Sequence, residues 1–287
     1  MQRTARLLLE LLGRLPVVGG PIRRRAWHPW RHRWVLYFGA RENVTFTQFM
    51  RLPRQYDALV GPVVDFLRPQ HGNEPLHVVV FGCSNGAEPY SMASVLSTRR
   101  PDVRFDILAL DIEPGMIEKA VQARSAPDEV NKMAAVDPAF AAATFIERDG
   151  AFEVRPEMRA RVRFGVADVL DPSVIARLDR ADIVVAQNFL YHLYRKRSRL
   201  AFGHLVSLLK PRSALLVDGM DIDMRQSLTK KAGLEPLDAL IAEIHADALK
   251  LRGAPWPWQY WSVEPMNTAH RDWKRRYATI YLRSDER

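Results

Sequence analysis

The stretch VVVFGCSNGAEPYSMASVL, residues Val78 to Leu96, places an apolar run, a short turn and a helical segment in direct succession. Gly82 and Gly86 bracket the turn, and glycine lets the backbone approach a ligand closely. Pro89 suits the first turn of a helix, where its missing N–H would have no partner in any case. The stretch therefore predicts a ligand-binding loop at the carboxyl edge of a parallel sheet.

The rest of the chain repeats the alternation of strand and helix. Short apolar, β-branched runs occur at 77–81, 105–110, 162–166, 182–186 and 214–217, with helical segments between most of them. This pattern predicts an α/β fold with a mostly parallel sheet that is buried on both faces. Asp149-Gly150 separates two further apolar runs and predicts a β-hairpin insertion at about residues 125–161. The last apolar run, near residues 275–284, predicts an antiparallel strand at the edge of the sheet.

The turn also limits the choice of cofactor. Asp111 ends the second predicted strand, 25 positions after Gly86, a distance at which an acidic residue accepts the hydroxyls of a ribose. The turn has no lysine for a Walker loop, and its G-x-x-x-G spacing differs from the dinucleotide fingerprint. Glu88 would repel a phosphate but attract an ammonium group. A nucleoside cofactor without phosphate, such as S-adenosylmethionine, fits this turn; the alternative is an ordinary turn with a solvated Asp111.

Composition sets the wider limits. The 287 residues are 47% hydrophobic, which is enough for one large core, and the single cysteine, Cys83, excludes an intramolecular disulfide and favours a cytoplasmic setting. Most of the net charge of +9 lies in residues 1–42, a basic amphipathic arm whose leucines share one helical face. The arm is suited to a membrane interface or an anionic partner, or it docks on the body. Glu10 and Arg14 interrupt its apolar run, so we expect no signal peptide and no membrane span.

At the level of motifs the sequence resembles the CheR-type methyltransferases. GCSNGAEPYSMA resembles their S/T-x-G-E-E-P-Y-S-I-A loop, and TFTQFMRLPRQYDAL resembles the segment before it. ALDIEPGMIEKA, FGVADVLDP and VVAQNFLYHL follow in the family's order. The resemblance covers about Thr45 to Gly219. It implies a class I methyltransferase domain over residues 43–287, Rossmann-like, with a seven-stranded mostly parallel sheet and helices on both faces.

The resemblance also implies a set of site residues. Arg51 and His192 are the implied catalytic residues; His192 stands where the family has a tyrosine beside the transferred methyl group. Three implied cofactor contacts depart from the family in residue type, namely Thr45, Asp168 and Gln187. The implied contacts to S-adenosylmethionine are Thr45, Thr47, Arg51, Gly82, Gly86, Glu88, Asp111, Asp168, Val169, Gln187 and Asn188.

The acceptor is predicted from the chemistry of methyl transfer. A carboxylate, on a small molecule or a protein side chain, is ionised near pH 7 and needs no base, and Arg51 would orient it or clamp the cofactor's carboxylate. His192 would act as a base for a hydroxyl or amine acceptor, or only line the site. The aromatic-rich region at about 234–275, with Trp256 and Trp258, would cap the pocket or pack on the arm.

Two other functions remain open at this point. The basic charge favours an RNA methyltransferase, but QNFLYHL lacks the N/D-P-P-Y/F signature of those enzymes, so we do not expect nucleic acid as the substrate. A non-catalytic regulator that binds the cofactor is the second alternative, and the retained Glu88 and Asp111 argue against it. The histidines lack ligand spacing, so we expect no metal site. The sequence leaves the oligomeric state open.

Overall fold

The structure is a computed structural model that describes residues 47–72, 74–128, 130, 137–251 and 264–284. Three predictions therefore lie outside the described residues: the basic arm at 1–42, the contact of Thr45, and the tryptophan cluster at 256–261.

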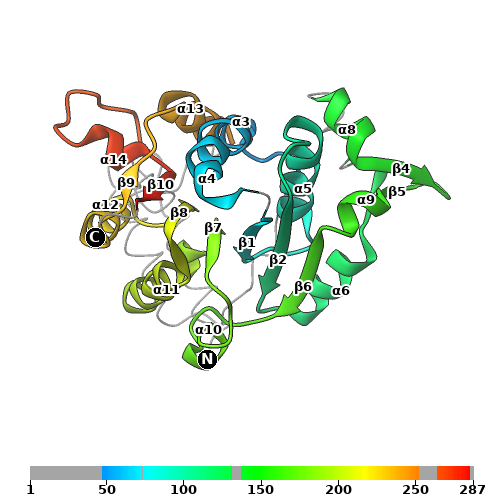
Figure 1. Ribbon diagram of the computed structural model, residues 1–287, viewed down its shortest axis with the longest axis horizontal. Coiled ribbons are helices and arrows are strands. Elements are labelled where there is room, and N and C mark those ends of the chain that lie inside the picture. Colours follow the sequence, from blue (N-terminus) through cyan, green and yellow to red (C-terminus); the bar gives the residue numbers. More distant parts are fainter. Residues whose placement is uncertain (1–46, 73, 129, 131–136, 252–263, 285–287) are drawn as a thin grey trace, which may run out of the picture.

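A seven-stranded sheet forms the centre of the molecule (Figure 1). Of these seven strands, the five that come first in the chain run parallel, and the last one, β10 (Ile280–Arg283), runs antiparallel to both of its neighbours. Numbering the seven strands by their place in the chain gives the spatial order 3-2-1-4-5-7-6. In spatial order the strands are β6 (Val162–Val166), β2 (Phe105–Asp111), β1 (Leu76–Phe81), β7 (Ala181–Gln187), β8 (Leu209–Asp218), β10 (Ile280–Arg283) and β9 (Glu235–Pro236).

Helices cover both faces of the sheet because the strands are apolar on both sides (Figure 1). Val78 and Val80 of β1 pack into one core, and Val79 and Phe81 into the other. These strands read as continuous apolar runs, as buried parallel strands do. The helices of the main domain are α3 (Pro53–Ala58), the π-helix η1 (Leu59–Val63), α4 (Val64–His71), α5 (Ala87–Arg99), α6 (Pro114–Gln122), α10 (Pro172–Ile175), the 3₁₀ helix η2 (Leu190–His192), α11 (Arg195–Ser207), α12 (Ile222–Lys231), α13 (Ile241–Leu251) and α14 (Trp273–Tyr277).

The predicted hairpin insertion is confirmed. Asp149 and Gly150 form its turn with φ of 50° and 71°, a left-handed pair that Asp-Gly adopts readily. The hairpin gains a third strand that the sequence did not predict, so a small antiparallel sheet projects beside α5 (Figure 1). Its elements are β3 (Arg124–Ser125), α8 (Pro138–Thr144), β4 (Phe145–Arg148), β5 (Ala151–Val154) and α9 (Pro156–Arg159).

The last strand departs from the prediction in one respect. β10 is antiparallel, as expected, but it lies between β8 and β9 rather than at the edge. The edge is β9, which has only two residues, and its Pro236 lacks the N–H that an inner strand would need. A two-residue strand has no period that the sequence could reveal.

Candidate functional site

The turn after β1 is built around its two glycines. Gly82 has φ of 71°, and a Cβ there would lie 2.7 Å from the ring of Phe189 in the segment after β7. Gly86 has φ of 88°, and a Cβ there would meet Ala120 at 3.1 Å. Positive φ and close neighbours both require glycine at these positions. The turn is thus held between the loop after β7 and helix α6.

Asp111, the last residue of β2, fixes this turn from the side. Its Oδ2 accepts the backbone N–H of Ser84 at 2.7 Å, and its Oδ1 accepts the N–H of Glu113 at 3.0 Å. The carboxylate is therefore oriented by the backbone and each oxygen keeps a lone pair for a ligand. Burial, followed by the charges of Asp111 and Glu88, raises the pKa of the Cys83 thiol. Cys83 is accordingly a protonated packing residue between two carboxylates.

Glu88, in the first turn of α5, is the most perturbed acid of the site. Burial raises its pKa from about 4.5 to about 7, and the Arg51 guanidinium opposes this shift. Burial, with a smaller contribution from Glu88, also raises the pKa of Tyr56. A carboxylate that is this costly to ionise, in a turn that borders a ligand edge, is a functional-site candidate.

The segments after β7 and β8 form the other side of the same edge. Asn188 has φ of 60°, and its N–H donates to the Asp218 carbonyl at 3.1 Å. The N–H of Tyr191 donates to the Gly219 carbonyl at 2.8 Å, and a Cβ on Gly219 would lie 2.6 Å from the Asn188 backbone. The two loops are therefore locked together. The His192 ring stacks at a tilt on Tyr191, with 3.9 Å between the ring centroids.

Gln187 has a partner that the sequence did not suggest. Its side-chain amide donates to the Gln55 carbonyl oxygen, and the Gln55 amide donates to Thr279 Oγ1 at 2.9 Å. All three side chains are buried. Gln187 thereby ties β7 to α3 and to the residue before β10, so the structure assigns its amide donor to the fold.

The loop after β6 completes the edge. The N–H of Ala167 donates to the Asp111 carbonyl at 2.9 Å, which brings the loop beside β2. Asp168 caps its own turn by accepting the N–H of Leu170 at 2.9 Å, and the Val169 side chain is buried. His204 of α11 holds this loop through its Nδ1, 2.7 Å from the Val169 carbonyl. Because a carbonyl only accepts, that Nδ1 must carry a proton.

The structure thus gathers most of the predicted site residues at one edge of the sheet. Thr47 is half-buried where the described chain begins, ahead of Arg51. Two residues that the sequence analysis missed are Ile112 and Val166, which are 43% and 56% exposed next to Asp111. Exposed apolar side chains beside the carboxylate suit a flat base on a ribose. Ile112 directly follows β2 and Val166 ends β6, and these places at the ends of strands were the available signal.

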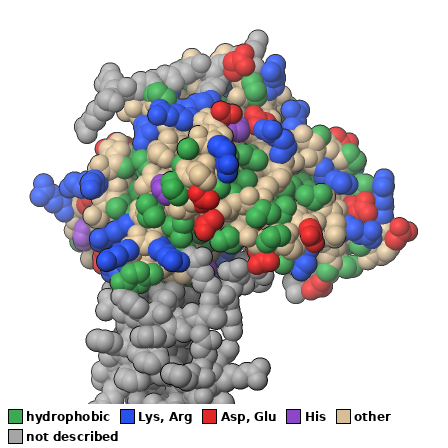
Figure 2. Space-filling view, turned by 90° about the horizontal axis from the view of Figure 1, so that it is seen from below, with side chains coloured by type: hydrophobic (Ala, Val, Ile, Leu, Met, Phe, Trp, Pro, Cys, Tyr) green, Lys and Arg blue, Asp and Glu red, His purple; other side chains and the backbone are tan. Residues whose placement is uncertain are grey.

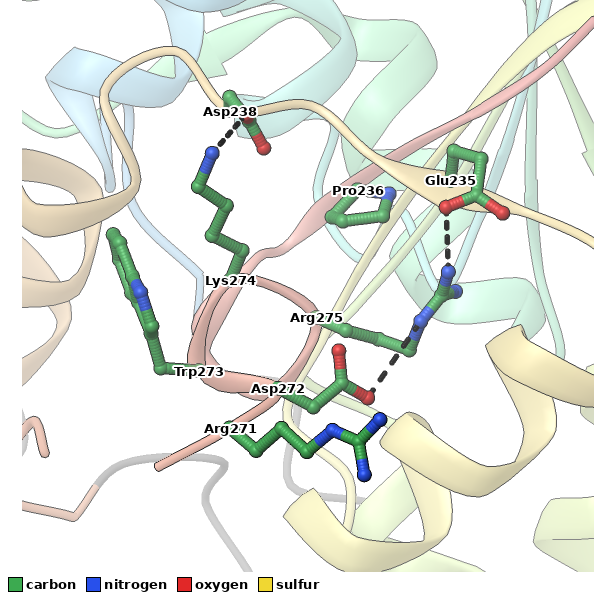
Figure 3. A pocket seen from close by; sticks show the side chains of 8 residues that line it. All are labelled: Glu235, Pro236, Asp238, Arg271, Asp272, Trp273, Lys274 and Arg275. Atoms are coloured by element: carbon green, nitrogen blue, oxygen red, sulfur yellow. Dashed lines mark hydrogen bonds and ion pairs between the residues drawn. The ribbon is translucent and has the colours of Figure 1, made fainter. Parts of the chain in front are cut away.

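An open hollow lies elsewhere, between β9 at the edge of the sheet and α14 (Figure 3). It has a volume of about 500 Å³ and contains none of the predicted site residues. Internal ion pairs hold its walls: Lys274 with Asp238, and Arg275 with Glu235 and Asp272. Its lining residues are Glu235, Pro236, Asp238, Arg271, Asp272, Trp273, Lys274 and Arg275.

The described part of the chain contains neither a metal-binding cluster nor a membrane-spanning helix. Across its described ranges no group of three or more His, Cys, Asp or Glu side chains is arranged to hold a metal ion. Within the same ranges no helix has the length and apolar character needed to cross a bilayer.

The strand order, the antiparallel β10 and the acidic turn after β1 define the class I methyltransferase fold. Residues 45–232 match the family model described as CheR methyltransferase, SAM binding domain. The chain belongs to this family, which uses S-adenosylmethionine as the methyl donor, and the predicted fold, enzyme class and cofactor are confirmed at this level. The match begins before α3 and ends after α12, so it spans every loop of the edge described above.

Relatives with assigned names are similar at modest identity. A probable biofilm formation methyltransferase, WspC, of Pseudomonas aeruginosa is 26% identical over 195 residues, which are 67% of this chain and 44% of that protein. A chemotaxis protein methyltransferase of Listeria innocua is 25% identical over 179 residues, 62% of this chain and 66% of that protein. The chain thus spans about half to two thirds of the length of these relatives.

A solved structure, magnesium protoporphyrin IX methyltransferase from Synechocystis PCC 6803 with bound S-adenosylmethionine, covers 75% of this chain and 86% of its own. It is 17% identical with a TM-score of 0.36, a likeness too distant to carry an argument.

Proposed function

We propose that this chain transfers a methyl group from S-adenosylmethionine to a carboxylate oxygen on a protein side chain. The observation that carries the proposal is the family match over residues 45–232, which includes the loops after β7 and β8 where an acceptor would enter. The name of the Listeria innocua relative, a chemotaxis protein methyltransferase, favours a protein acceptor over a small molecule.

The residues present fit the cofactor. Asp111 offers an oriented carboxylate to the ribose hydroxyls, and the exposed Ile112 and Val166 offer apolar contact to the base. Glu88 offers a buried negative charge to an ammonium group, which compensates its desolvation. Asp168 and Val169 would border the base, and Gly82 and Gly86 keep the turn free of side chains that would fill the edge.

Bound there, S-adenosylmethionine supplies a methyl group on a sulfonium, which is already a good leaving group. The protein's task is to align the acceptor with that methyl group and to exclude water. Arg51 would neutralise and orient an acceptor carboxylate by a charge-assisted hydrogen bond. Such a carboxylate is ionised near pH 7 and needs no base, so we assign His192, with Asn188 and Tyr191, to the wall of the acceptor site.

The type of bond that carries the transferred methyl group tests this function. A methyl ester hydrolyses in mild alkali and releases methanol, whereas methylated amines and ethers do not. The full chain, incubated with tritiated S-adenosylmethionine and a cell extract from which small molecules have been removed, is expected to give protein-bound tritium that alkali converts into volatile methanol. Alkali-stable label, label on RNA, or no label with intact cofactor binding would each contradict the proposal.

The pKa of Glu88 predicts how cofactor affinity depends on pH. The folded chain keeps a proton on Glu88 until the pH rises through about 7. A ligand with an ammonium group therefore reaches its full affinity only above that pH. Affinity for S-adenosylhomocysteine is expected to fall by about tenfold for each pH unit below 7. Calorimetric titrations from pH 5.5 to 8.5 measure this slope.

Two variants and the stability of the free chain test the same group. Glu88→Gln should bind S-adenosylhomocysteine weakly, with an affinity that does not change with pH below 7. Glu118→Gln, on the exposed face of α6, should keep the wild-type dependence of affinity on pH. Since the unfolded chain releases this proton near pH 4.5, the ligand-free fold should lose stability as the pH rises from about 4.5 to about 7. A Glu88→Gln profile identical to that of the wild type would refute the assignment.

A further inference from the structure

The helix α11 begins three residues after His192 and starts with four cations in five positions. Arg195, Lys196, Arg197 and Arg199 are all exposed, and Leu200 beside them is 50% exposed. The buried residues of the helix lie on the opposite side, at Ser198, Ala201, Phe202 and Leu205. The four cations are named here the α11 basic face.

This face is largely unneutralised within the described chain. Arg195 approaches Asp221 at 3.7 Å, but among residues 47–284 with the stated gaps no ion pair joins Lys196, Arg197 or Arg199 to an acid. The nearby carboxylates have other roles: Asp221 caps α12 through the N–H of Met224, and Asp223 pairs with Arg276 at 2.7 Å.

Helix stability does not explain this arrangement. The first turn of α11 has no acidic residue, and the preceding Tyr194 provides no side-chain cap. Cations at this end oppose the helix dipole and repel one another, so Asp or Glu would stabilise the helix better. Basic residues at a helix amino end, with no contact in the fold to offset their cost, are expected where the surface binds a partner.

The α11 basic face adjoins the acceptor side of the site. Arg195 contacts the first turn of α12 through Asp221, and the loops that precede these two helices are joined by the bond between Tyr191 and Gly219. Figure 2, which views the molecule from the side where α10 and α11 lie in Figure 1, shows Lys and Arg side chains exposed across this face. A partner bound on α11 therefore reaches the carboxyl edge of the sheet.

We infer that the α11 basic face docks an acidic protein segment that carries the acceptor carboxylate. The inference rests on the proposed function, since it names the protein class that the same site would methylate. Charge complementarity supports this occupant: a carboxylate acceptor among further Asp or Glu residues presents the opposite charge to the face. The exposed Leu200 can also contact the CH₂ groups of the segment's acidic side chains, which adds buried apolar area while the charges stay paired.

The test compares two triple charge reversals. The first changes Lys196, Arg197 and Arg199 to Glu, and the second changes Arg104, Arg177 and Arg180 to Glu. The second set is exposed and lies before β2 and β7, at the opposite edge of the sheet. Each set lowers the net charge by six units, from +9 to +3, so long-range charge is matched.

The probe is a fluorescein-labelled peptide of glutamate and alanine, with a glutamine and alanine peptide as its neutral counterpart. Anisotropy is recorded with the full chain saturated with S-adenosylhomocysteine at low salt. The wild type is expected to bind the glutamate peptide in preference to the glutamine peptide, and the α11 reversal is expected to weaken this binding at least about tenfold while the control reversal changes it less than about threefold. Added salt should weaken the wild-type complex.

Several results would overturn the inference: equal losses in the two reversals, equal binding of the two peptides, or tighter binding of RNA or of phosphatidylglycerol vesicles at the same face. Calorimetry with S-adenosylhomocysteine on each variant separates this inference from the proposed function. If the chain forms esters on a protein and the α11 reversal leaves the KM for that protein unchanged, the docking inference is wrong and the proposed function stands. If the glutamate peptide docks on α11 but no methyl group is transferred to any protein, the proposed function is wrong and the docking surface stands.

Discussion

Replacing Asp111 by asparagine is expected to weaken the binding of S-adenosylhomocysteine about 100-fold, as measured by calorimetry. Hydrogen bonds to a charged acceptor contribute about 1.5 to 3 kcal/mol each, and a ribose offers two hydroxyls to this carboxylate. Asparagine keeps one oxygen, and its NH₂ group faces one of the two N–H donors, of Ser84 or Glu113, that now orient the carboxylate. The ribose acceptor and the shape of the turn are therefore both disturbed.

The control lies on the same strand. Asp106→Asn removes the same charge from β2 at a carboxylate that is 39% exposed and pairs with His77. Its affinity for S-adenosylhomocysteine should stay within about twofold of wild type, because surface pairs contribute little. Thermal melts of both variants show whether each is folded. A folded Asp111→Asn chain with wild-type affinity would be incompatible with a ribose at this carboxylate.

Replacing Arg225 by methionine is expected to lower the free energy of unfolding by about 3 to 5 kcal/mol. Arg225 of α12 is fully buried, and its guanidinium donates to Asp218 Oδ1 at 3.2 Å and to the Arg276 carbonyl at 2.9 Å. Methionine fills similar space but leaves the buried Asp218 carboxylate without its cation. Urea denaturation of the ligand-free chain measures the loss.

Two further variants separate the charge effect from packing. Adding Asp218→Asn to Arg225→Met should recover part of the stability, because the buried charge is then gone as well. Arg195→Met removes an arginine from a looser pair, 3.7 Å from Asp221 and 48% exposed, and should cost less than about 1 kcal/mol. If the double variant were as unstable as the single one, the uncompensated charge would not be the cause.

The core of the fold was predictable because buried parallel strands are apolar on both faces. The bounds predicted for β6, Val162–Val166, are those observed; β1 and β2 differ by one residue at one end, and β7 by one residue at each end. β8 begins at Leu209 rather than Ala214, since Lys210 and Arg212 break the apolar run and the pairing with β7 is irregular there. Strands of two residues, β3 and β9, depend on their neighbours and left no pattern in the sequence.

The candidate site was predictable where residues lie in one local motif. Gly82, Glu88 and Asp111 meet because the ends of neighbouring parallel strands share an edge, which strand order alone implies. Contacts between distant segments were not predictable from local pattern. Gln187 is hydrogen-bonded to Gln55, which is 132 positions away in the sequence, and His204 to the Val169 carbonyl, which is 35 positions away. The pKa of Glu88 likewise depends on burial that only the folded chain provides.

A crystal structure of the chain with S-adenosylhomocysteine bound tests the central claim most directly. The account predicts the ribose hydroxyls within hydrogen-bonding distance of Asp111, the base against Ile112, and the ammonium group on the Glu88 side of the turn. Electron density for a nucleotide with its phosphates beside Glu88, or for the adenosine at another edge of the sheet, would contradict it.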